Sequence, residues 1–106
     1  MSQADPQVLL VHNDETLSRL VSYLVAKEEW SINEERNSET ALSSALEKTP
    51  YLVLIDLLMK DVDGFELLKE FNDKLPDVPV VVITSQASIE SAVRAMHCGA
   101  YDYVTK

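Results

Sequence analysis

The sequence predicts a doubly wound α/β sandwich, in which helices cover both faces of a five-stranded parallel sheet. Three observations lead to this fold class. Short apolar runs recur along the chain, and four of them close on a polar group, as residues 51–56 do on Asp56. Segments with apolar residues at helical spacing separate these runs. The run at residues 80–83 has no polar alternation, which is typical of a central parallel strand buried on both faces.

The apolar runs define the expected strands. The second run alternates and is the weakest of them, whereas the others are short and continuous. Pro76 and Pro79 bracket the turn into the fourth run. The five expected strands are residues 7–11, 30–33, 51–55, 80–83 and 101–105.

A segment with apolar residues at helical spacing lies between each two consecutive strands. From Asp14 the pattern changes to apolar residues three or four apart, and Ser38 is the expected N-cap of a second helix that ends before Pro50. A third helix begins at Gly64, and a fourth runs from Ser88 to a stop at Gly99. Four helices for five strands leave one flank of the sheet uncovered. We therefore expect residues 1–106 to be one domain and an excerpt of a longer protein, with the final helix missing.

Composition narrows the class of protein. The chain has 106 residues, 9 basic and 18 acidic side chains and a net charge of −9, which argues against direct nucleic-acid binding through a basic surface. Cys98 is the only cysteine, so an internal disulfide is impossible and a reducing environment is expected. The chain shows neither a signal peptide nor an apolar run near the ~18 residues of a membrane span. These features favour a cytoplasmic location without membrane contact.

Four polar residues are expected at one edge of the sheet, because ligands of open α/β sheets bind beyond the carboxyl ends of the strands. These residues are Asn13, Asp56, Thr84 and Lys106. A carboxylate, an amide, a hydroxyl and an ammonium in one crevice suit phosphoryl transfer to an aspartate, which needs a nucleophile, Mg²⁺ and donors for the phosphoryl oxygens.

These motifs resemble the receiver domain of bacterial two-component response regulators over nearly the whole chain. The resemblance is carried by the acid that ends the third strand and the pattern after it, by the hydroxyl that ends the fourth strand, and by the aromatic residue and lysine of the fifth. Residues 95–106 are most similar to the receivers of enhancer-binding transcription activators. The matching positions are Asp56 to Met59, Asp63, Gly64, Thr84, Tyr103 and Lys106.

The resemblance implies a fold, a function and partners. The fold is flavodoxin-like (CheY-like), with strand order 2-1-3-4-5. Asp56 is the expected phosphoacceptor, Thr84 and Lys106 bind the phosphoryl oxygens, and Thr84 and Tyr103 act as the switch. A sensor histidine kinase is the implied donor, and an output domain or dimer partner receives the signal in transcription regulation. The domain itself is not an enzyme.

The resemblance also implies a Mg²⁺ site, held by Asp56, Asn13 and the backbone carbonyl of Leu58. The family normally places two acids directly after the first strand, but this chain has His12 and Asn13 there. An amide oxygen is a weaker donor than a carboxylate, so the affinity for Mg²⁺ should fall. His12 could occupy the site as a neutral group or, when protonated, replace part of the metal's charge. Asp14 could help indirectly.

Two other functions stay open at this stage. The first is a pseudo-receiver, a phosphorylation-independent module for protein interaction or dimerisation. The second is a hydrolase that forms an aspartyl-phosphate, but such enzymes carry a second acid two residues after the nucleophile, where this chain has Leu58. Tyr103 could also be an aromatic residue that only packs under a helix, and Lys106 could be only solvated.

Overall fold

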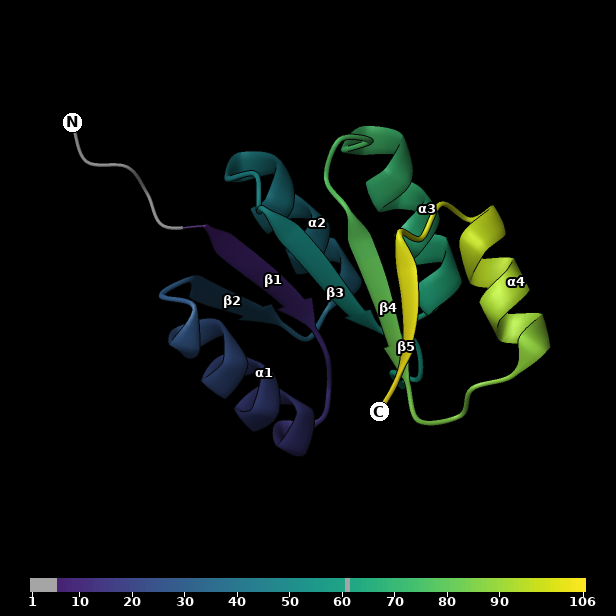
Figure 1. Cartoon of the computed structure of the whole chain (residues 1–106). Helices are drawn as coiled ribbons and strands as arrows, with labels where there is room; N and C mark the ends of the chain where they lie inside the picture. Colours follow the sequence, from purple (N-terminus) through teal and green to yellow (C-terminus); the bar gives the residue numbers. More distant parts are fainter. Residues whose placement is uncertain (1–5, 61) are drawn as a thin grey trace.

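The computed structural model describes residues 6–60 and 62–106, which alternate strands and helices around one parallel sheet (Figure 1). The order along the described chain is β1 (Gln7–Val11), α1 (Glu15–Lys27), β2 (Ser31–Glu35), α2 (Ser38–Glu47), β3 (Leu52–Asp56), α3 (Gly64–Lys74), β4 (Val80–Thr84), α4 (Ile89–His97) and β5 (Asp102–Thr105).

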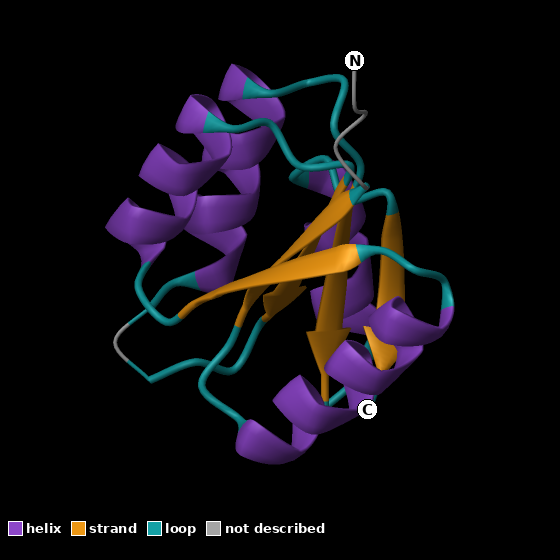
Figure 2. Ribbon diagram, turned by 90° about the vertical axis from the view of Figure 1, so that its left-hand side faces the viewer, coloured by secondary structure: helices purple, strands orange, loops and turns teal. Residues whose placement is uncertain are grey.

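The sheet has five strands in the order β2-β1-β3-β4-β5, and every neighbouring pair is parallel. This arrangement confirms the predicted doubly wound fold and its strand order. Figure 2 shows the strands as a twisted layer between helices. Because all strands point the same way, their carboxyl ends meet at one edge of the sheet.

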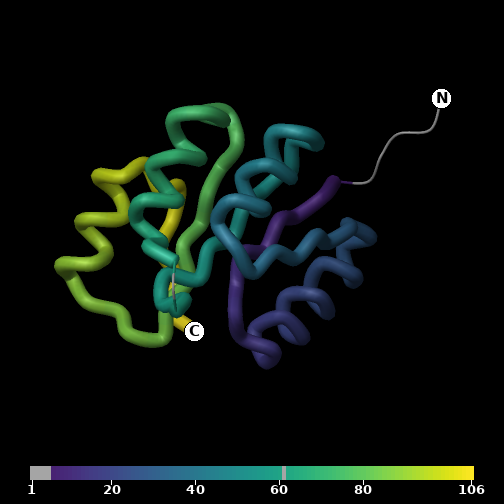
Figure 3. Tube along the Cα trace, turned by 180° about the vertical axis from the view of Figure 1, so that it is seen from behind, coloured from purple at the N-terminus to yellow at the C-terminus, as the bar shows by residue number. Residues whose placement is uncertain are grey.

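The two faces of the sheet carry different numbers of helices. On one face, α2, α3 and α4 lie in a row (Figures 1 and 3) and bury the larger apolar core, which includes Leu9, Ile55, Leu68, Phe71 and Val82. On the other face, α1 contributes its buried apolar residues to a smaller core against β1. The larger core packs against the three strands in the middle of the sheet, β1, β3 and β4. The ends of β3, β4 and the edge strand β5 carry the candidate site.

The strand bounds differ from the predicted ones by one or two residues. β2 starts one residue later than expected and continues to Glu35, and β5 starts at Asp102. Tyr51 lies outside β3, where it is exposed and meets Trp30 edge to face, with the ring centroids 5.6 Å apart. At its other end β3 runs one residue further than predicted and includes Asp56, which pairs with Ile83 of β4 in the sheet ladder.

Side chains cap the helices at their N-termini. Asp14, Asp63 and Ser88 cap α1, α3 and α4. Asn37, not Ser38, caps α2, because the Asn37 side chain accepts hydrogen bonds from the backbone N–H groups of the first turn. The prediction of Ser38 was wrong by one residue because both types are good N-caps.

Two glycines have distinct roles in the backbone. Gly99 has φ +101°, a conformation that other residues rarely adopt, and this ends α4 as predicted. Gly64 permits a close approach, since a Cβ added there would lie 2.9 Å from a Leu57 side-chain atom and 3.0 Å from its Cα. α3 can therefore start directly against the end of β3.

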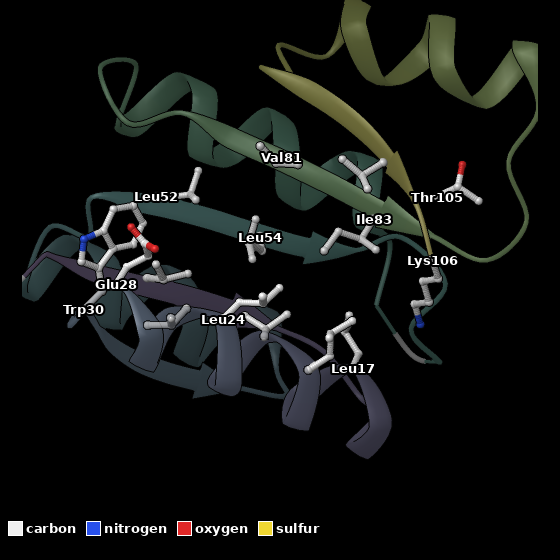
Figure 4. Close-up of a pocket in the computed structure, with 15 residues that line it drawn as sticks. Leu17, Leu24, Glu28, Trp30, Leu52, Leu54, Val81, Ile83, Thr105 and Lys106 are labelled. Carbon is white, nitrogen blue, oxygen red and sulfur yellow. The ribbon is translucent and has the colours of Figure 1, made fainter.

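The α1 face of the sheet carries an apolar groove of about 430 Å³ between α1 and β5 (Figure 4). α1 lines it with Leu20 and Leu24, which are 56% and 51% exposed, and the sheet lines it with Val81 and Val104. Among the described residues no further helix covers this groove. The expectation of one uncovered flank is therefore met for this part of the chain.

Candidate functional site

Asp56 ends β3 and is 3% exposed, with both carboxylate oxygens engaged. One oxygen, Oδ1, accepts a hydrogen bond of 3.0 Å from the backbone N–H of Leu58, and Oδ2 lies 2.8 Å from Nζ of Lys106. Ile83 of β4 is its partner in the ladder. The carboxylate therefore contacts the lysine that follows β5, and this cation balances its charge.

Thr84 and Lys106 lie beside Asp56 because β4 and β5 are the next two strands of the sheet. The backbone N–H of Lys106 donates to the carbonyl oxygen of Thr84 over 2.8 Å, which fixes the lysine at the end of β5. The Thr84 hydroxyl oxygen accepts from the N–H of Gln86 over 3.1 Å. A hydroxyl that accepts one bond still has a proton to donate. Three predicted site residues thus lie at the ends of three adjacent strands.

The Lys106 ammonium lies between two carboxylates. Its Nζ is 2.8 Å from Oδ2 of Asp56 and 2.8 Å from Oδ2 of Asp14. Partial burial disfavours the charged lysine, but the hydrogen bonds to Asp14 and Asp56 outweigh it and raise the pKa of Lys106 above its ordinary value. The hydrogen bond from Lys106 likewise lowers the pKa of Asp14. Asp14 is thus in direct contact with the site.

Asp14 also caps α1. This capping position was the signal in the sequence that could have predicted where the Asp14 side chain lies. Its Oδ1 accepts from the N–H groups of Thr16 and Leu17 at 3.0 and 3.2 Å. An acid one residue ahead of a helical pattern is a typical N-cap, and capping directs one oxygen towards the helix. The other oxygen is then free to meet Lys106, which the spacing alone did not reveal.

His12 does not point into the site. The ring is fully buried, Nδ1 accepts from the backbone N–H of Asp14 over 3.1 Å, and Nε2 lies 2.7 Å from Oε1 of Glu34 on β2. Since Nδ1 accepts, the proton sits on Nε2 and is donated to Glu34. Ser18 of α1 donates to the same Glu34 oxygen. His12 therefore does not fill the metal position. It has a structural role instead, because it links the end of β1 to β2.

Glu34 is held as a carboxylate by these contacts. The hydrogen bond from Ser18 lowers its pKa most, with burial opposing and His12 and Arg36 adding to the lowering. The result is a part-buried polar link that joins the loop after β1 to β2 and to α1.

Asn13 and Leu58 were the other predicted metal ligands. The Asn13 amide oxygen lies 3.5 Å from a guanidinium nitrogen of Arg36, on the exposed side of the loop. Arg36 also pairs with Glu15. Leu58 contributes its backbone N–H to Asp56 in this structure. The assignment of Asn13 and of the Leu58 carbonyl to the metal remains a prediction.

Tyr103 of β5 is half-buried, and its hydroxyl points to the start of α4. It contacts the Ser91 hydroxyl and accepts from the N–H of Ser88 at 3.4 Å. Its ring also packs on the larger core. This residue therefore joins β5 to the N-terminus of α4.

The donor set suits Mg²⁺, which commonly takes one or two carboxylates and completes its shell with water and phosphate oxygens. The carboxylates of Asp56 and Asp14 already share one cation, the Lys106 ammonium. No group of three or more His, Cys, Asp or Glu able to hold a metal is found in the described part of the chain. Two carboxylates are within the number that Mg²⁺ commonly takes from a protein.

A comparison with protein families finds a match to the response regulator receiver domain over residues 8–106. Among curated proteins, the chain is 34% identical over 100 residues to the regulatory protein AtoC of Escherichia coli, covering 94% of this chain and 22% of that protein. It is also 34% identical over 101 residues to the nitrogen assimilation regulatory protein NtrX of Azorhizobium caulinodans, covering 93% of this chain and 22% of that protein. The chain thus spans about a fifth of the length of these relatives.

Solved structures agree with the family match. A response regulator of Burkholderia pseudomallei with a phosphorylated aspartic acid, calcium ion and citrate has a TM-score of 0.88 at 25% identity, covering 96% of this chain and 60% of that chain. The beryllofluoride-activated NtrC4 receiver domain dimer has a TM-score of 0.87 at 27% identity, covering 94% of this chain and 83% of that chain. In the described ranges, the helices are all too short or too polar to cross a membrane.

Proposed function

Because the chain belongs to the response regulator receiver domain family, we propose that Asp56 is its phosphoacceptor and that a sensor histidine kinase is the donor. Receiver domains of response regulators are signalling modules, and two-component signal transduction is the function of this one. The single observation that carries the assignment is the contact of 2.8 Å between Asp56 and Lys106 at the ends of two different strands.

Asp56 and the residues around it have separate roles in the proposed phosphoryl transfer. A carboxylate oxygen of Asp56 forms the new O–P bond while the bond from phosphorus to the donor breaks. Lys106 is already within 2.8 Å of this carboxylate and pairs with the added charge, and the Thr84 hydroxyl donates to a phosphoryl oxygen. Backbone contacts of the sheet hold Thr84 and Lys106 at the ends of β4 and β5.

Mg²⁺ is the proposed cofactor, with Asp56 as its anionic ligand and Asn13 and the Leu58 carbonyl as the further ligands predicted from the family pattern. When bound, the metal supplies positive charge that offsets the phosphoryl oxygens. The replacement of the usual acidic pair by His12 and Asn13 lowers the expected affinity.

The switch is proposed to run through Thr84 and Tyr103. Phosphorylation draws the Thr84 hydroxyl towards Asp56, and Tyr103 then moves inward and gives up its contacts with Ser88 and Ser91 on α4. This is a shift between two packings of the surface formed by α4 and β5. In a Tyr103→Phe variant the hydroxyl contacts are absent, so amide hydrogen exchange at the start of α4 should already be faster before phosphorylation.

The receiver domain, residues 1–106, is proposed to be part of a longer, cytoplasmic protein with an output domain in transcription regulation. Two observations support this: the relatives are several times longer than the match, and an apolar groove lies open beside α1. Such a surface favours a covering segment or a partner. Reading the gene beyond the codon for Lys106 tests the proposal directly.

The test of phosphorylation is an intact-mass measurement after incubation with a small phosphodonor and Mg²⁺. We expect the wild-type chain to gain one phosphoryl group and Asp56→Asn to gain none. Asp63→Asn is the matched control, since Asp63 is a nearby loop acid that caps α3 and asparagine caps equally well. An unmodified wild-type mass would favour the alternative, a pseudo-receiver that acts as a phosphorylation-independent interaction module.

A further inference from the structure

We propose that Asp14 is the second carboxylate of the phosphoacceptor site, where it holds Lys106 beside Asp56 and shares the binding of a divalent cation with Asp56. The residue thereby takes over from the two positions directly after β1, which hold His12 and Asn13. This inference rests on the proposed function of Asp56 and assigns a further residue to that site.

The geometry places the two carboxylates around one cation position. Oδ2 of Asp14 and Oδ2 of Asp56 are each 2.8 Å from Nζ of Lys106, so these oxygens are at most twice that distance apart. Asp14 and Asp56 are 42 residues apart in the sequence, and Asp56 and Lys106 are 50 apart. The sheet and the start of α1 nevertheless bring the three together. An ammonium is therefore seated where two acidic oxygens converge.

The two oxygens of Asp14 have separate roles. Oδ1 caps α1 by accepting from Thr16 and Leu17, and this fixes the carboxyl plane relative to the helix. Oδ2 is left to face Lys106. The cap thus orients the oxygen that serves the site, and the two roles can be separated by substitution.

His12 is the positioning residue for Asp14. The N–H of Asp14 donates to Nδ1 of His12, and Nε2 of the ring is anchored on Glu34. Because the ring is fully buried and bonded at both nitrogens, it sets the path of the loop between β1 and α1. An aspartate at position 12 has no ring to span from the Asp14 N–H to β2.

Asn13 is less suited to this role. Its amide is neutral, and its oxygen lies towards Arg36 on the exposed side of the loop. A neutral amide neither pairs with the Lys106 ammonium as a charge nor offers the anionic oxygen that Mg²⁺ prefers. The acidic function lost from positions 12 and 13 is therefore supplied one residue later.

A consequence is competition between the ammonium and a divalent cation. Oδ2 of Asp14 and Oδ2 of Asp56 both contact the ammonium, so a metal that takes its position between these two oxygens has to displace Lys106 from at least one of them. Removing the ammonium should therefore strengthen metal binding, although it weakens the contact to the phosphoryl group.

The experiment is a calorimetric Mg²⁺ titration of the chain without any phosphodonor. Asp14→Asn keeps the cap, because asparagine caps as well as aspartate, but removes the charge facing Lys106. We expect about a tenfold or greater loss of Mg²⁺ affinity in Asp14→Asn and little change in the matched control Glu15→Gln, an exposed acid one residue on. Lys106→Met should bind Mg²⁺ more tightly than wild type.

Other results would overturn the assignment. These are wild-type affinity in Asp14→Asn, a greater loss in Asn13→Ala than in Asp14→Asn, or absence of Mg²⁺ binding by the wild-type chain. For His12, we expect His12→Asn to retain more Mg²⁺ affinity than His12→Leu, because an asparagine oxygen can still accept from the Asp14 N–H. Equal losses would show that His12 acts only through stability.

The two proposals fail in different ways. The mass measurement on wild type and Asp56→Asn decides phosphorylation without reference to Asp14. The titration decides the role of Asp14 without any phosphoryl transfer. A wild-type chain that binds Mg²⁺ through Asp14 but gains no phosphoryl group would reject only the function proposed for Asp56.

Discussion

The β1 end of the site and the ends of β3, β4 and β5 are built in different ways. At β3 to β5, Asp56, Thr84 and Lys106 are each the last residue of a strand or follow it directly, and backbone ladder contacts place them. After β1, the loop is placed by side chains, through the link from His12 to Glu34 and the cap by Asp14.

The β1 end of the site and the ends of β3 to β5 should therefore respond differently to substitution. Changes at Thr84 and Lys106 remove groups that are proposed to touch the reacting atoms, but they leave the ladder intact. Changes at His12 or Glu34 break a part-buried polar link and should act first on stability.

The largest expected effect is on phosphorylation in Thr84→Val. Valine keeps the β-branched shape in the strand but removes the hydroxyl that is proposed to donate to a phosphoryl oxygen. Loss of one such donor typically costs about a hundredfold in rate. Mass measurement over time with a small phosphodonor checks this, and a rate within twofold of wild type would exclude a role for the hydroxyl.

The next effect is on stability in His12→Leu. Leucine fills similar space but leaves the Asp14 N–H and the part-buried Glu34 carboxylate without the histidine as partner, so the free energy of unfolding should fall by about 1–3 kcal/mol. Denaturation in urea measures it. The comparison with Thr84→Val is the check: an equal or larger loss of stability in Thr84→Val would contradict the division between the two halves.

The sequence predicted the half of the site that the sheet builds. Strand ends follow from apolar runs, and parallel strands bring their carboxyl ends together, so Asp56, Thr84 and Lys106 could be placed without coordinates. The orientation of His12 and the second oxygen of Asp14 could not, because they depend on Glu34, which belongs to β2 but lies one residue beyond the predicted second strand, residues 30–33. The N-cap of α2 was also mispredicted, as Ser38 and not Asn37, because two residues that cap well are adjacent there.

The exposed apolar residues of α1 show the same limit for the core. Helical spacing groups Leu17, Leu20, Val21 and Leu24 on one side of α1, but the structure buries only Leu17 and Val21 of these. Leu20 and Leu24 line the open groove beside β5 (Figure 4). Periodicity marks an apolar face of a helix but not what covers each part of it.

A smaller effect is expected in the pH dependence of stability. The pKa of Glu34 is lowered in the folded chain by Ser18 first and also by His12 and Arg36, so the unfolded state binds the proton more tightly. This contribution is present above the unfolded pKa of a glutamate, about 4.3, and is lost as the pH falls through the lower folded pKa. Glu34→Gln should therefore lose less stability than wild type on acidification. Parallel acid profiles of the two chains, measured by urea denaturation, would contradict this.

The smallest effect is expected in Arg36→Ala. Arg36 pairs with Glu15 and lies 3.5 Å from Asn13, and both partners are on the exposed side of the loop. Solvent screens such pairs, so the free energy of unfolding should change by less than about 1 kcal/mol. The position of Asp14 should not change, because it depends on the buried His12 and on the cap. The Mg²⁺ affinity of Arg36→Ala should therefore stay within about twofold of wild type, a difference of roughly 0.4 kcal/mol. A larger loss in a calorimetric titration would mean that Arg36 and Asn13, rather than His12, set the β1 end of the site.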